Sequence, residues 1–350
     1  MSNGKVRAPT KATSFDIAYL AGVSQPTVSR ALRGSPEVSE ETRRRVEAIA
    51  QQLNYKVDKN ASNLRGHRSN TLALLFFADP TPDDSQINPF FHSMLGSITR
   101  ACARNGCDLL VSFQQQAGQW HEDYADTRKA DGLILLGYGD YLEYRGRLTR
   151  LVEQGTNFVL WGAMQAGQPG LSVGSDNFQG SATATRHLIG LGRRNIAFLG
   201  AASTHYPEFL ERYRGYSQAL KDAGIVPHRA LQVDSISTER SGYSATLELI
   251  ERGVAFDAIV AASDLIAMGA LHALQERTVN VPQQVALVGF DDIPAATLTH
   301  PPLTTVAQDT RLAGDVLVET VLSQIRGEPV AAKTLATHLV VRQSCGSRCG

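Results

Sequence analysis

One short stretch near the N-terminus carries polar side chains of the kinds that bind nucleic acid. A helix is expected over Gln25–Leu32, with Val28 and Ala31 facing inward. Its outer face then combines an arginine, an amide and hydroxyls, which can contact base edges in the major groove. The alternative is a three-helix bundle that docks on a protein or has no partner. The residues expected to contact DNA are Ser24, Gln25, Pro26, Thr27, Ser29, Arg30 and Arg33.

A second group of residues, spread through the rest of the chain, combines aromatic rings with carboxylates, an amide and an arginine. Flat rings stack on the C–H faces of a sugar, and charged side chains bind its hydroxyls. Each residue also has a structural alternative: the phenylalanines could be core, Arg212 could pair with Glu208, and Asp291 could cap a turn before Pro294. The candidates for this effector site are Asn88, Phe90, Phe91, Trp161, Asp176, Arg212 and Asp291, with Asn177 and Asp292 adjacent.

No pattern of residues predicts catalysis, and neither a metal nor a cofactor is expected. The nine histidines form no H-E-x-x-H motif, and there is no G-x-S-x-G elbow, P-loop or convincing G-x-G-x-x-G. Asp291 and Asp292 are neighbours in the chain, and adjacent side chains usually diverge. The four cysteines, Cys102, Cys107, Cys345 and Cys349, fit neither zinc spacing nor a dense disulfide framework, so free thiols are expected. The chain is therefore not expected to be an enzyme.

Three short helices are expected to position the first group. Ser14 is expected to N-cap a helix through Leu20, Ser24 to cap the helix over Gln25–Leu32, and Ser39 to begin a third helix over Glu40–Leu53. Their apolar residues suffice for a small core. Residues 58–65 can be helical but have almost no apolar surface, so that segment is expected to need a partner to fold.

Alternating short apolar runs and amphipathic stretches are expected to position the second group. Strands are predicted at 71–77, 108–113, 132–136, 158–161, 196–199, 258–261 and 285–290, and helices at 90–104, 141–154, 182–191, 210–223, 241–251 and 265–276. The strict alternation of strands and helices predicts an α/β fold with parallel sheets covered on both faces. There are too many units for one sheet, which predicts two similar doubly wound lobes. Ligands of such sheets bind at the carboxyl ends of strands.

The charge of the chain is divided unevenly. The 350 residues contain 34 basic and 34 acidic side chains. Residues 1–68 hold 12 basic and 6 acidic residues, a net of +6, and the remaining 22 basic and 28 acidic residues give −6. A basic module joined to an acidic body is typical of nucleic-acid-binding proteins, although basic termini also occur as solvated tails. No apolar run is long enough for a signal peptide or a bilayer span, so a cytoplasmic, nucleoid-associated protein is expected.

The N-terminal segments resemble the DNA-binding headpiece of the LacI/GalR family of bacterial transcriptional regulators. The similar segments are 16–24, 27–32, 38–43, 53–55 and 60–66. The resemblance implies that Gln25, Pro26 and Arg30 read operator bases, that Thr27 and Ser29 contact bases or phosphates, and that Ala61 and Leu64 form a hinge in the minor groove, with Leu64 as the inserted wedge. The chain departs from the family at Val57-Asp58, where Pro-Asn is usual, and Pro26 can make only apolar base contacts.

Segments 212–216, 263–271, 288–294, 301–306 and 339–344 are similar to the effector-binding core of the same family. The resemblance implies the fold of periplasmic sugar-binding proteins. It places Phe90, Phe91, Arg212 and Asp291 at the effector, together with Asp176 and Trp161. Ser263 stands where the family usually has asparagine.

The combined expectation is a repressor of carbohydrate-utilisation genes, whose operator affinity is controlled by a mono- or disaccharide bound between two lobes. Residues 1–57 would be the helix-turn-helix headpiece, 58–69 the hinge, and 70–344 the core, with one lobe from 70–185 and 308–330 and the other from 186–307 and 331–344. A homodimer on near-palindromic DNA is expected, because no leucine heptads follow residue 344. The alternative is a soluble sugar-binding sensor that does not bind DNA.

Overall fold

The chain divides into two units, residues 1–69 and 70–350, which are treated separately below. The computed structural model describes residues 12–32, 34–55, 69–76, 87–113, 120, 122–137 and 139–347. Arg33, Ala61, Leu64 and Cys349 lie outside the described residues, as does Phe77.

Three helices form the N-terminal unit: α1 (Ser14–Ala21), α2 (Gln25–Leu32) and α3 (Glu40–Gln52). The prediction that Ser14 caps α1 is wrong, because Thr13 is the N-cap and forms a reciprocal capping box with Asp16. The expected caps of the other two helices are confirmed. The Oγ of Ser24 accepts the amide of Thr27, and the Oγ of Ser39 accepts the amide of Thr42. The three helices enclose a core made of Ile17, Ala18, Ala21, Val28, Ala31, Val38, Val46 and Ala50.

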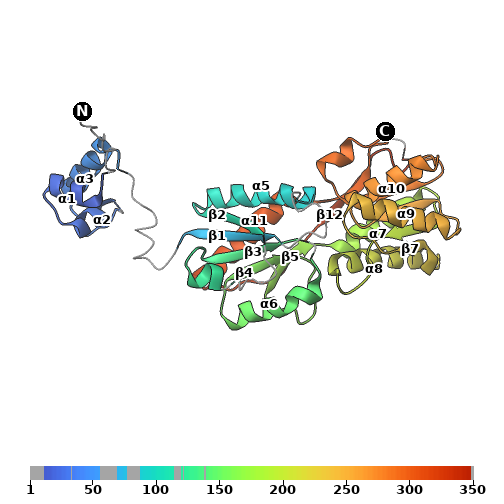
Figure 1. The fold of residues 1–350 in the computed structure, drawn as a ribbon, viewed down its shortest axis with the longest axis horizontal. Helices are drawn as coiled ribbons and strands as arrows, with labels where there is room; N and C mark the ends of the chain where they lie inside the picture. The colour runs from blue at the N-terminus through green and yellow to red at the C-terminus, as the bar shows by residue number, and fades with distance from the viewer. Residues whose placement is uncertain are drawn as a thin grey trace, which may run out of the picture. The chain divides into compact units, whose positions relative to one another are not determined.

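The second unit contains two six-stranded sheets, which confirms the predicted two-lobed α/β fold (Figure 1). The N-lobe sheet has the order β11-β5-β4-β3-β1-β2, and all its described pairs are parallel. Its strands are β1 (Thr71–Phe76), β2 (Asp108–Phe113), β3 (Gly132–Leu136), β4 (Phe158–Trp161), β5 (Leu171–Ser175) and β11 (Lys333–Leu335). Its helices are α5 (Pro89–Arg104), α6 (Tyr141–Glu153) and α11 (Thr310–Arg326).

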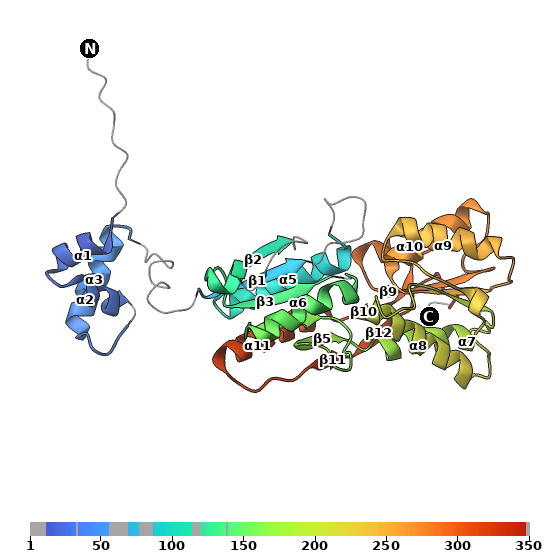
Figure 2. The same ribbon diagram turned by 60° about the horizontal axis from the view of Figure 1, so that its bottom comes forward.

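The C-lobe sheet has the order β12-β10-β9-β8-β6-β7, and its β10–β12 pair is antiparallel. Helices α7 and α8 pack together on one face, and α9 and α10 pack together on the other (Figures 1 and 2). The strands are β6 (Ile196–Leu199), β7 (Gln232–Val233), β8 (Ala258–Ala261), β9 (Ala286–Asp291), β10 (Thr304–Gln308) and β12 (Thr337–Val340). The helices are α7 (Asn177–Gly190), α8 (Pro207–Asp222), α9 (Glu239–Glu251) and α10 (Asp264–Glu276).

Several elements begin elsewhere than predicted, and these shifts matter for the site. Strand β9 ends at Asp291 rather than at residue 290, and α8 begins at Pro207 rather than 210, so Arg212, near the start of the predicted helix, lies well inside α8. The sequence patterns missed β5, β7, β10, β11, β12 and α11. The missed strands have two to five residues each and lack the continuous apolar run that marks the equally short β4, β6 and β8.

The chain passes between the lobes three times, after β5, after β10 and after β11. Helix α7 packs on the C-lobe sheet, and β11 pairs with β5 in the N-lobe sheet. The expected lobe limits at 185/186 and 330/331 are therefore wrong: strand pairing and helix packing place these crossings near 176 and 336. Among the described helices, none is long and apolar enough to cross a membrane. Cys102, Cys107 and Cys345 are free thiols, as expected.

Candidate DNA-binding helix and effector site

Helix α2 presents the predicted DNA-contacting residues on the surface of the N-terminal unit. Val28 and Ala31 are fully buried, whereas Ser24, Pro26 and Arg30 are exposed. Gln25, Thr27 and Ser29 are half-buried. The Oγ atoms of Ser24 and Thr27 lie 2.8 Å apart, and Gln25 donates to the Oγ of Ser14 at 3.3 Å. Each of these contacts involves an exposed or half-buried group, so it can be exchanged for a contact with DNA.

Arg30 forms an ion pair with Glu37, with 3.3 Å between Nε and Oε2. Both side chains are more than half exposed. Ion pairs of this kind contribute little, about 0–1 kcal/mol, because water and salt screen them. Arg30 is therefore available to a base at small cost.

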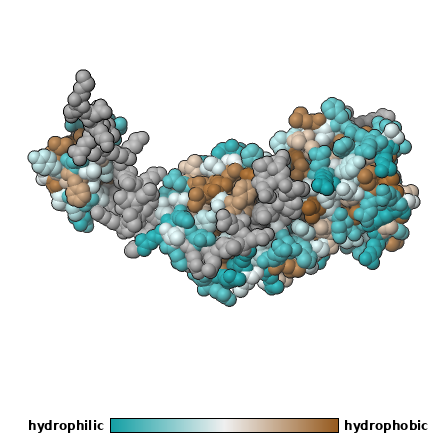
Figure 3. Space-filling view, viewed as in Figure 1, coloured by the Kyte–Doolittle hydropathy of each residue, from teal (hydrophilic) through white to brown (hydrophobic). Residues whose placement is uncertain are grey.

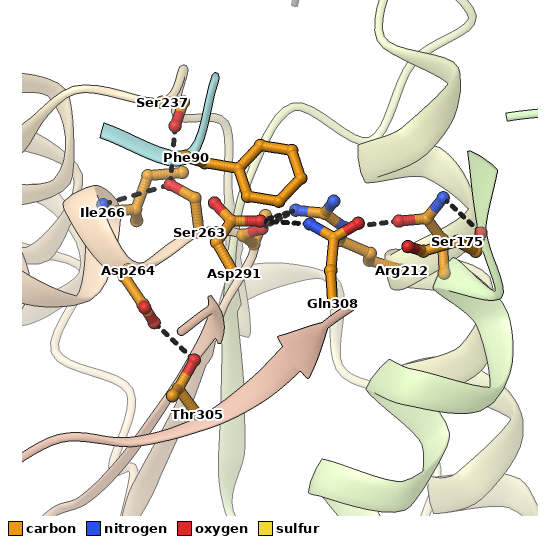
Figure 4. Close-up of polar contacts among 12 residues, drawn as sticks. Phe90, Ser175, Arg212, Ser237, Ser263, Asp264, Ile266, Asp291, Thr305 and Gln308 are labelled. Carbon is orange, nitrogen blue, oxygen red and sulfur yellow. Dashed lines mark hydrogen bonds and ion pairs between the residues drawn. The ribbon is translucent and has the colours of Figure 1, made fainter. Parts of the chain in front are cut away.

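In the second unit, Arg212 and Asp291 form a buried ion pair at the carboxyl end of the C-lobe sheet (Figure 4). Arg212 Nη1 lies 3.6 Å from Asp291 Oδ1, and the two side chains are 1% and 2% exposed. The guanidinium also lies over the ring of Phe290, with its central carbon 3.8 Å from the ring centroid. A second hydrogen bond runs from Arg212 Nη1 to the carbonyl of Ala262. The charges of the pair thus compensate each other in a site from which water is largely excluded.

Two amide side chains complete this arrangement, which we call the Arg212 cluster: Asn177, Arg212, Asp291 and Gln308. Arg212 Nε donates to Asn177 Oδ1 at 2.8 Å, and Gln308 Nε2 donates to Asp291 Oδ1 at 2.7 Å. The amide of Asn177 donates in turn to the carbonyl of Ser175 at 3.0 Å. Asp291 has a φ of 113°, a conformation that non-glycine residues rarely adopt and that surrounding contacts must hold.

A chain of buried polar groups crosses from the N-lobe to the C-lobe beside the Arg212 cluster. Asn88 Nδ2 donates to Ser237 Oγ at 3.2 Å, and Ser237 Oγ donates to Ser263 Oγ at 2.9 Å. Ser263 also N-caps α10 by accepting the amide of Ile266. Ser263 therefore occupies a capping position, and its hydroxyl links the helix to the lobe contact.

Two buried carboxyls lie at the same lobe boundary. Burial, and then the nearby charge of Asp291, raise the pKa of Asp264 well above its ordinary value. Its oxygens accept from Thr305 Oγ1 at 2.5 Å and from the amide of Ile293 at 2.9 Å. Burial likewise raises the pKa of Glu208, which accepts the amide of Ala163 from the N-lobe at 2.9 Å. Asp264 therefore secures the loop after β9, and Glu208 secures a contact between the lobes.

Of the predicted effector residues, Asn88 belongs to the polar chain between the lobes, and the other six fall into three groups. Phe90, Arg212 and Asp291 lie together, with the ring of Phe90 beside the ion pair (Figure 4). Phe91 and Trp161 are buried neighbours of Phe90, with ring centroids 5.2 and 6.1 Å from it. Asp176 instead caps α7, because its Oδ1 accepts the amide of Gln179 at 2.9 Å. In this geometry the carboxylate of Asp176 serves as a helix cap.

Four residues near the site were missed by the sequence patterns: Ser237, Gln308, Phe290 and Phe209, whose ring centroid lies 5.3 Å from the central guanidinium carbon of Arg212. Gln308 is the last residue of β10. Had that strand been recognised, Gln308 would have been a candidate, because ligands bind at the carboxyl ends of such strands. Nothing in the sequence indicates Ser237. A separate open pocket of about 640 Å³ lies on the C-lobe surface, away from the Arg212 cluster, and is lined by His228, Arg229, Ala230, Gln232, Val233, Asp234, Glu248 and Arg252.

Comparison with known proteins matches both parts of this arrangement. Residues 15–58 match the model of bacterial regulatory proteins of the lacI family, and residues 185–345 match a periplasmic binding protein-like domain. The HTH-type transcriptional regulator CelR of Thermobifida fusca is 32% identical over 340 residues, which cover 94% of this chain and 96% of CelR. The chain belongs to the lacI family of bacterial regulatory proteins. It is a DNA-binding transcriptional regulator.

Other lacI-family members are similar over nearly the whole length. The ribose operon repressor of Escherichia coli K12 is 28% identical over 317 residues, covering 90% of this chain and 93% of the repressor. A lac repressor dimer bound to operator and the anti-inducer ONPF superposes with a TM-score of 0.82 at 25% identity, covering 96% and 99% of the two chains. A CelR–cellobiose complex gives a TM-score of 0.71 at 31% identity, covering 95% and 99%. These relatives are transcriptional regulators and not enzymes.

Proposed function

We propose that this lacI-family regulator is a repressor whose operator affinity is set by an uncharged sugar bound at the Arg212 cluster. The observation that carries the proposal is the buried Arg212–Asp291 pair with its two amides, beside the ring of Phe90. Such a set of donors, acceptors and rings suits a polyol with hydroxyl groups and C–H faces. CelR, which is similar over nearly the full length, has a solved structure in complex with cellobiose. This supports a glucoside or a disaccharide as the effector of the present protein.

The charge of the cluster favours a neutral ligand over a sugar phosphate. The charge of Arg212 is compensated by Asp291, and the other buried ionisable side chains named above, Asp264 and Glu208, are acids. A phosphate would need a cation or a set of free amides to replace its hydration. The hydroxyl of Ser175, buried and without a hydrogen-bond partner among the described residues, could pair with a sugar hydroxyl.

We infer a homodimer from the exposed edge of the N-lobe sheet. Strand β2 is an edge strand, and Leu110, Val111 and Phe113 are 37%, 42% and 49% exposed. Hydrophobic surface lies over the region of α5 and β2 in Figure 3. An apolar edge strand invites pairing, and a two-fold dimer would cover it with a second copy.

In the proposed arrangement, residues 1–57 form the headpiece, 58–69 the hinge and 70–344 the core. Two headpieces bind the half-sites of a near-palindromic operator, where Arg30 and Gln25 read bases and Ala61 and Leu64 occupy the minor groove. The protein acts in the cytoplasm, without a catalytic step. The alternative of a sugar sensor without DNA binding leaves the polar face of α2 unexplained.

The proposal is tested in two steps with the full-length protein. Operator sequences are first selected from a random palindromic library, and binding is measured by fluorescence anisotropy at several salt concentrations. The affinity should fall steeply with salt, because phosphate contacts release counterions. Cellobiose, ribose and glucose 6-phosphate are then added. We expect a neutral sugar to change the operator Kd at least tenfold. Selection of no sequence at low salt, or a response only to the phosphate, would overturn the proposal.

A further inference from the structure

The three passages between the lobes run side by side, next to the Arg212 cluster. At the first passage the amide of Asp176 donates to the carbonyl of Leu335 at the third, with an N···O distance of 2.8 Å. Thr337 Oγ1 donates back to the carbonyl of Asp176 at 3.4 Å. Gln308, at the second passage, pairs with Thr337 in the antiparallel β10–β12 ladder. A change in the angle between the lobes must therefore pass through all three segments together.

Both amides of the Arg212 cluster belong to these passages. Asn177 is the first residue of α7, directly after the first passage, and the whole residue is 4% exposed. Gln308 is the last residue of β10, directly before Asp309 caps α11 on the N-lobe. Arg212 and Asp291 lie on α8 and β9, inside the C-lobe. The ion pair is thus held at each end by a residue of a different passage (Figure 4).

We propose that Asn177 and Gln308 are positioning residues that couple occupancy of the effector site to the angle between the lobes. This inference rests on the proposed function, because it assumes that the effector binds at the Arg212–Asp291 pair. The amides need not touch the effector. They fix the two charged side chains that do, and they can do so only while the passages keep the geometry seen here.

The physical basis is the short range of hydrogen bonds compared with hinge motions. Domain closure is absorbed by a few residues whose φ and ψ change substantially. A displacement of about 1 Å removes most of the strength of contacts that are now 2.7 and 2.8 Å long. Asp291 also holds an unfavourable φ of 113°, so its carboxylate depends on its partners for orientation. A sugar that needs both charged groups in place will therefore favour one lobe angle over others.

The variant Gln308→Met tests the coupling in full-length protein. It removes the donor to Asp291 and keeps the length of the side chain. Gln324→Met is the matched control, because Gln324 of α11 donates from the same kind of amide to the carbonyl of Phe158 at 3.1 Å, within the N-lobe. The quantity measured is the coupling factor, which is the larger operator Kd divided by the smaller one, measured without cellobiose and at saturating cellobiose, or with another sugar that the panel selects.

We expect the coupling factor of Gln308→Met to fall at least fivefold toward 1, and that of Gln324→Met to equal the wild-type value. If Gln308 were only an effector contact, the sugar Kd would weaken and saturation would restore full coupling. If its role were only structural, the melting temperature would fall without loss of coupling. Either of these results would overturn the inference.

Hydrogen exchange of the sugar-free protein provides a readout that does not need the effector. The amides of Asp176, Gln179 and Gly180 are hydrogen-bonded at the first passage. Loss of one contact that stabilises this arrangement should speed their exchange about fivefold in Gln308→Met, and not in Gln324→Met. Faster exchange confined to residues around 308 would refute the coupling. If no sugar changes operator binding by wild type, the proposed function fails, and the exchange result still shows whether Gln308 stabilises the three passages.

Discussion

Removing Arg212 should destabilise the body of the protein strongly, and the effect can be worked out from its contacts. The variant Arg212→Met replaces the guanidinium with an apolar chain of similar reach. Asp291 then keeps its buried carboxylate, 2% exposed, without the cation now 3.6 Å away. Breaking a buried pair from one side costs about 3–5 kcal/mol of unfolding free energy, because an uncompensated charge remains. That is a large part of the ~5–15 kcal/mol by which folded proteins are stable.

A double variant separates the charge effect from simple loss of packing. In Arg212→Met with Asp291→Asn, neither partner is charged, and asparagine tolerates the positive φ at position 291. We expect the double variant to lose about 2–3 kcal/mol less than the sum of the two single variants. The control is Arg214→Met on the same helix. Arg214 pairs with Glu211 at the surface, where it is 57% exposed, and its loss should cost under about 1 kcal/mol.

The assay is urea unfolding followed by circular dichroism at one fixed protein concentration, because a dimer makes the midpoint depend on concentration. Equal losses in Arg212→Met and Arg214→Met would show that the buried pair does not stabilise the lobe. Strict additivity of Arg212→Met and Asp291→Asn would show that the two side chains act independently. Either result would refute the argument that this pair is a compensated unit.

Three further predictions concern other parts of the chain. Asp264→Asn should make stability less sensitive to pH. Because the folded pKa of Asp264 is raised, its contribution is present below its ordinary pKa and is lost as pH rises through the raised one. The melting temperature of the variant minus that of wild type should therefore increase as pH rises above the ordinary pKa of aspartate, and a constant difference would contradict this. Val111→Glu, on the exposed edge of β2, should shift sedimentation from dimer toward monomer at micromolar concentration, and an unchanged dimer would place the interface elsewhere. Arg30→Ala should weaken operator binding by about 1–3 kcal/mol without lowering the melting temperature of the headpiece, whereas Arg44→Ala, an exposed residue of α3 paired with Glu40, should change operator binding less; equal effects would remove Arg30 from the bases.

The headpiece could be predicted almost completely from the sequence. Its helices are short and bounded by serine caps and a glycine stop, and its core residues recur at helical spacing. The errors are shifts of one residue: Thr13 rather than Ser14 is the first cap, and α1 and α3 end at Ala21 and Gln52 rather than at Leu20 and Leu53. Such signals are local in sequence, so they can be recognised before the fold is known.

The alternation of strands and helices in the body was also readable, but its short strands were not. Strands β5, β10, β11 and β12 have three to five residues and owe their conformation to neighbours in the sheet. Gln308 was missed for that reason, since its strand was not recognised. Asp176 was predicted at the effector from the family resemblance, yet the start of α7 directly after it makes its carboxylate a helix cap.

By itself, the sequence determined the two kinds of domain, the basic N-terminal end, and the identity of the charged residues Arg212 and Asp291. Only the tertiary structure decided that these two side chains meet, and that Asn177 and Gln308 hold them from two passages between the lobes. Helix caps and apolar periodicity depend on residues three or four positions apart. The site depends on four elements, α7, α8, β9 and β10, which come together because crossover connections bring them to one edge of a single sheet.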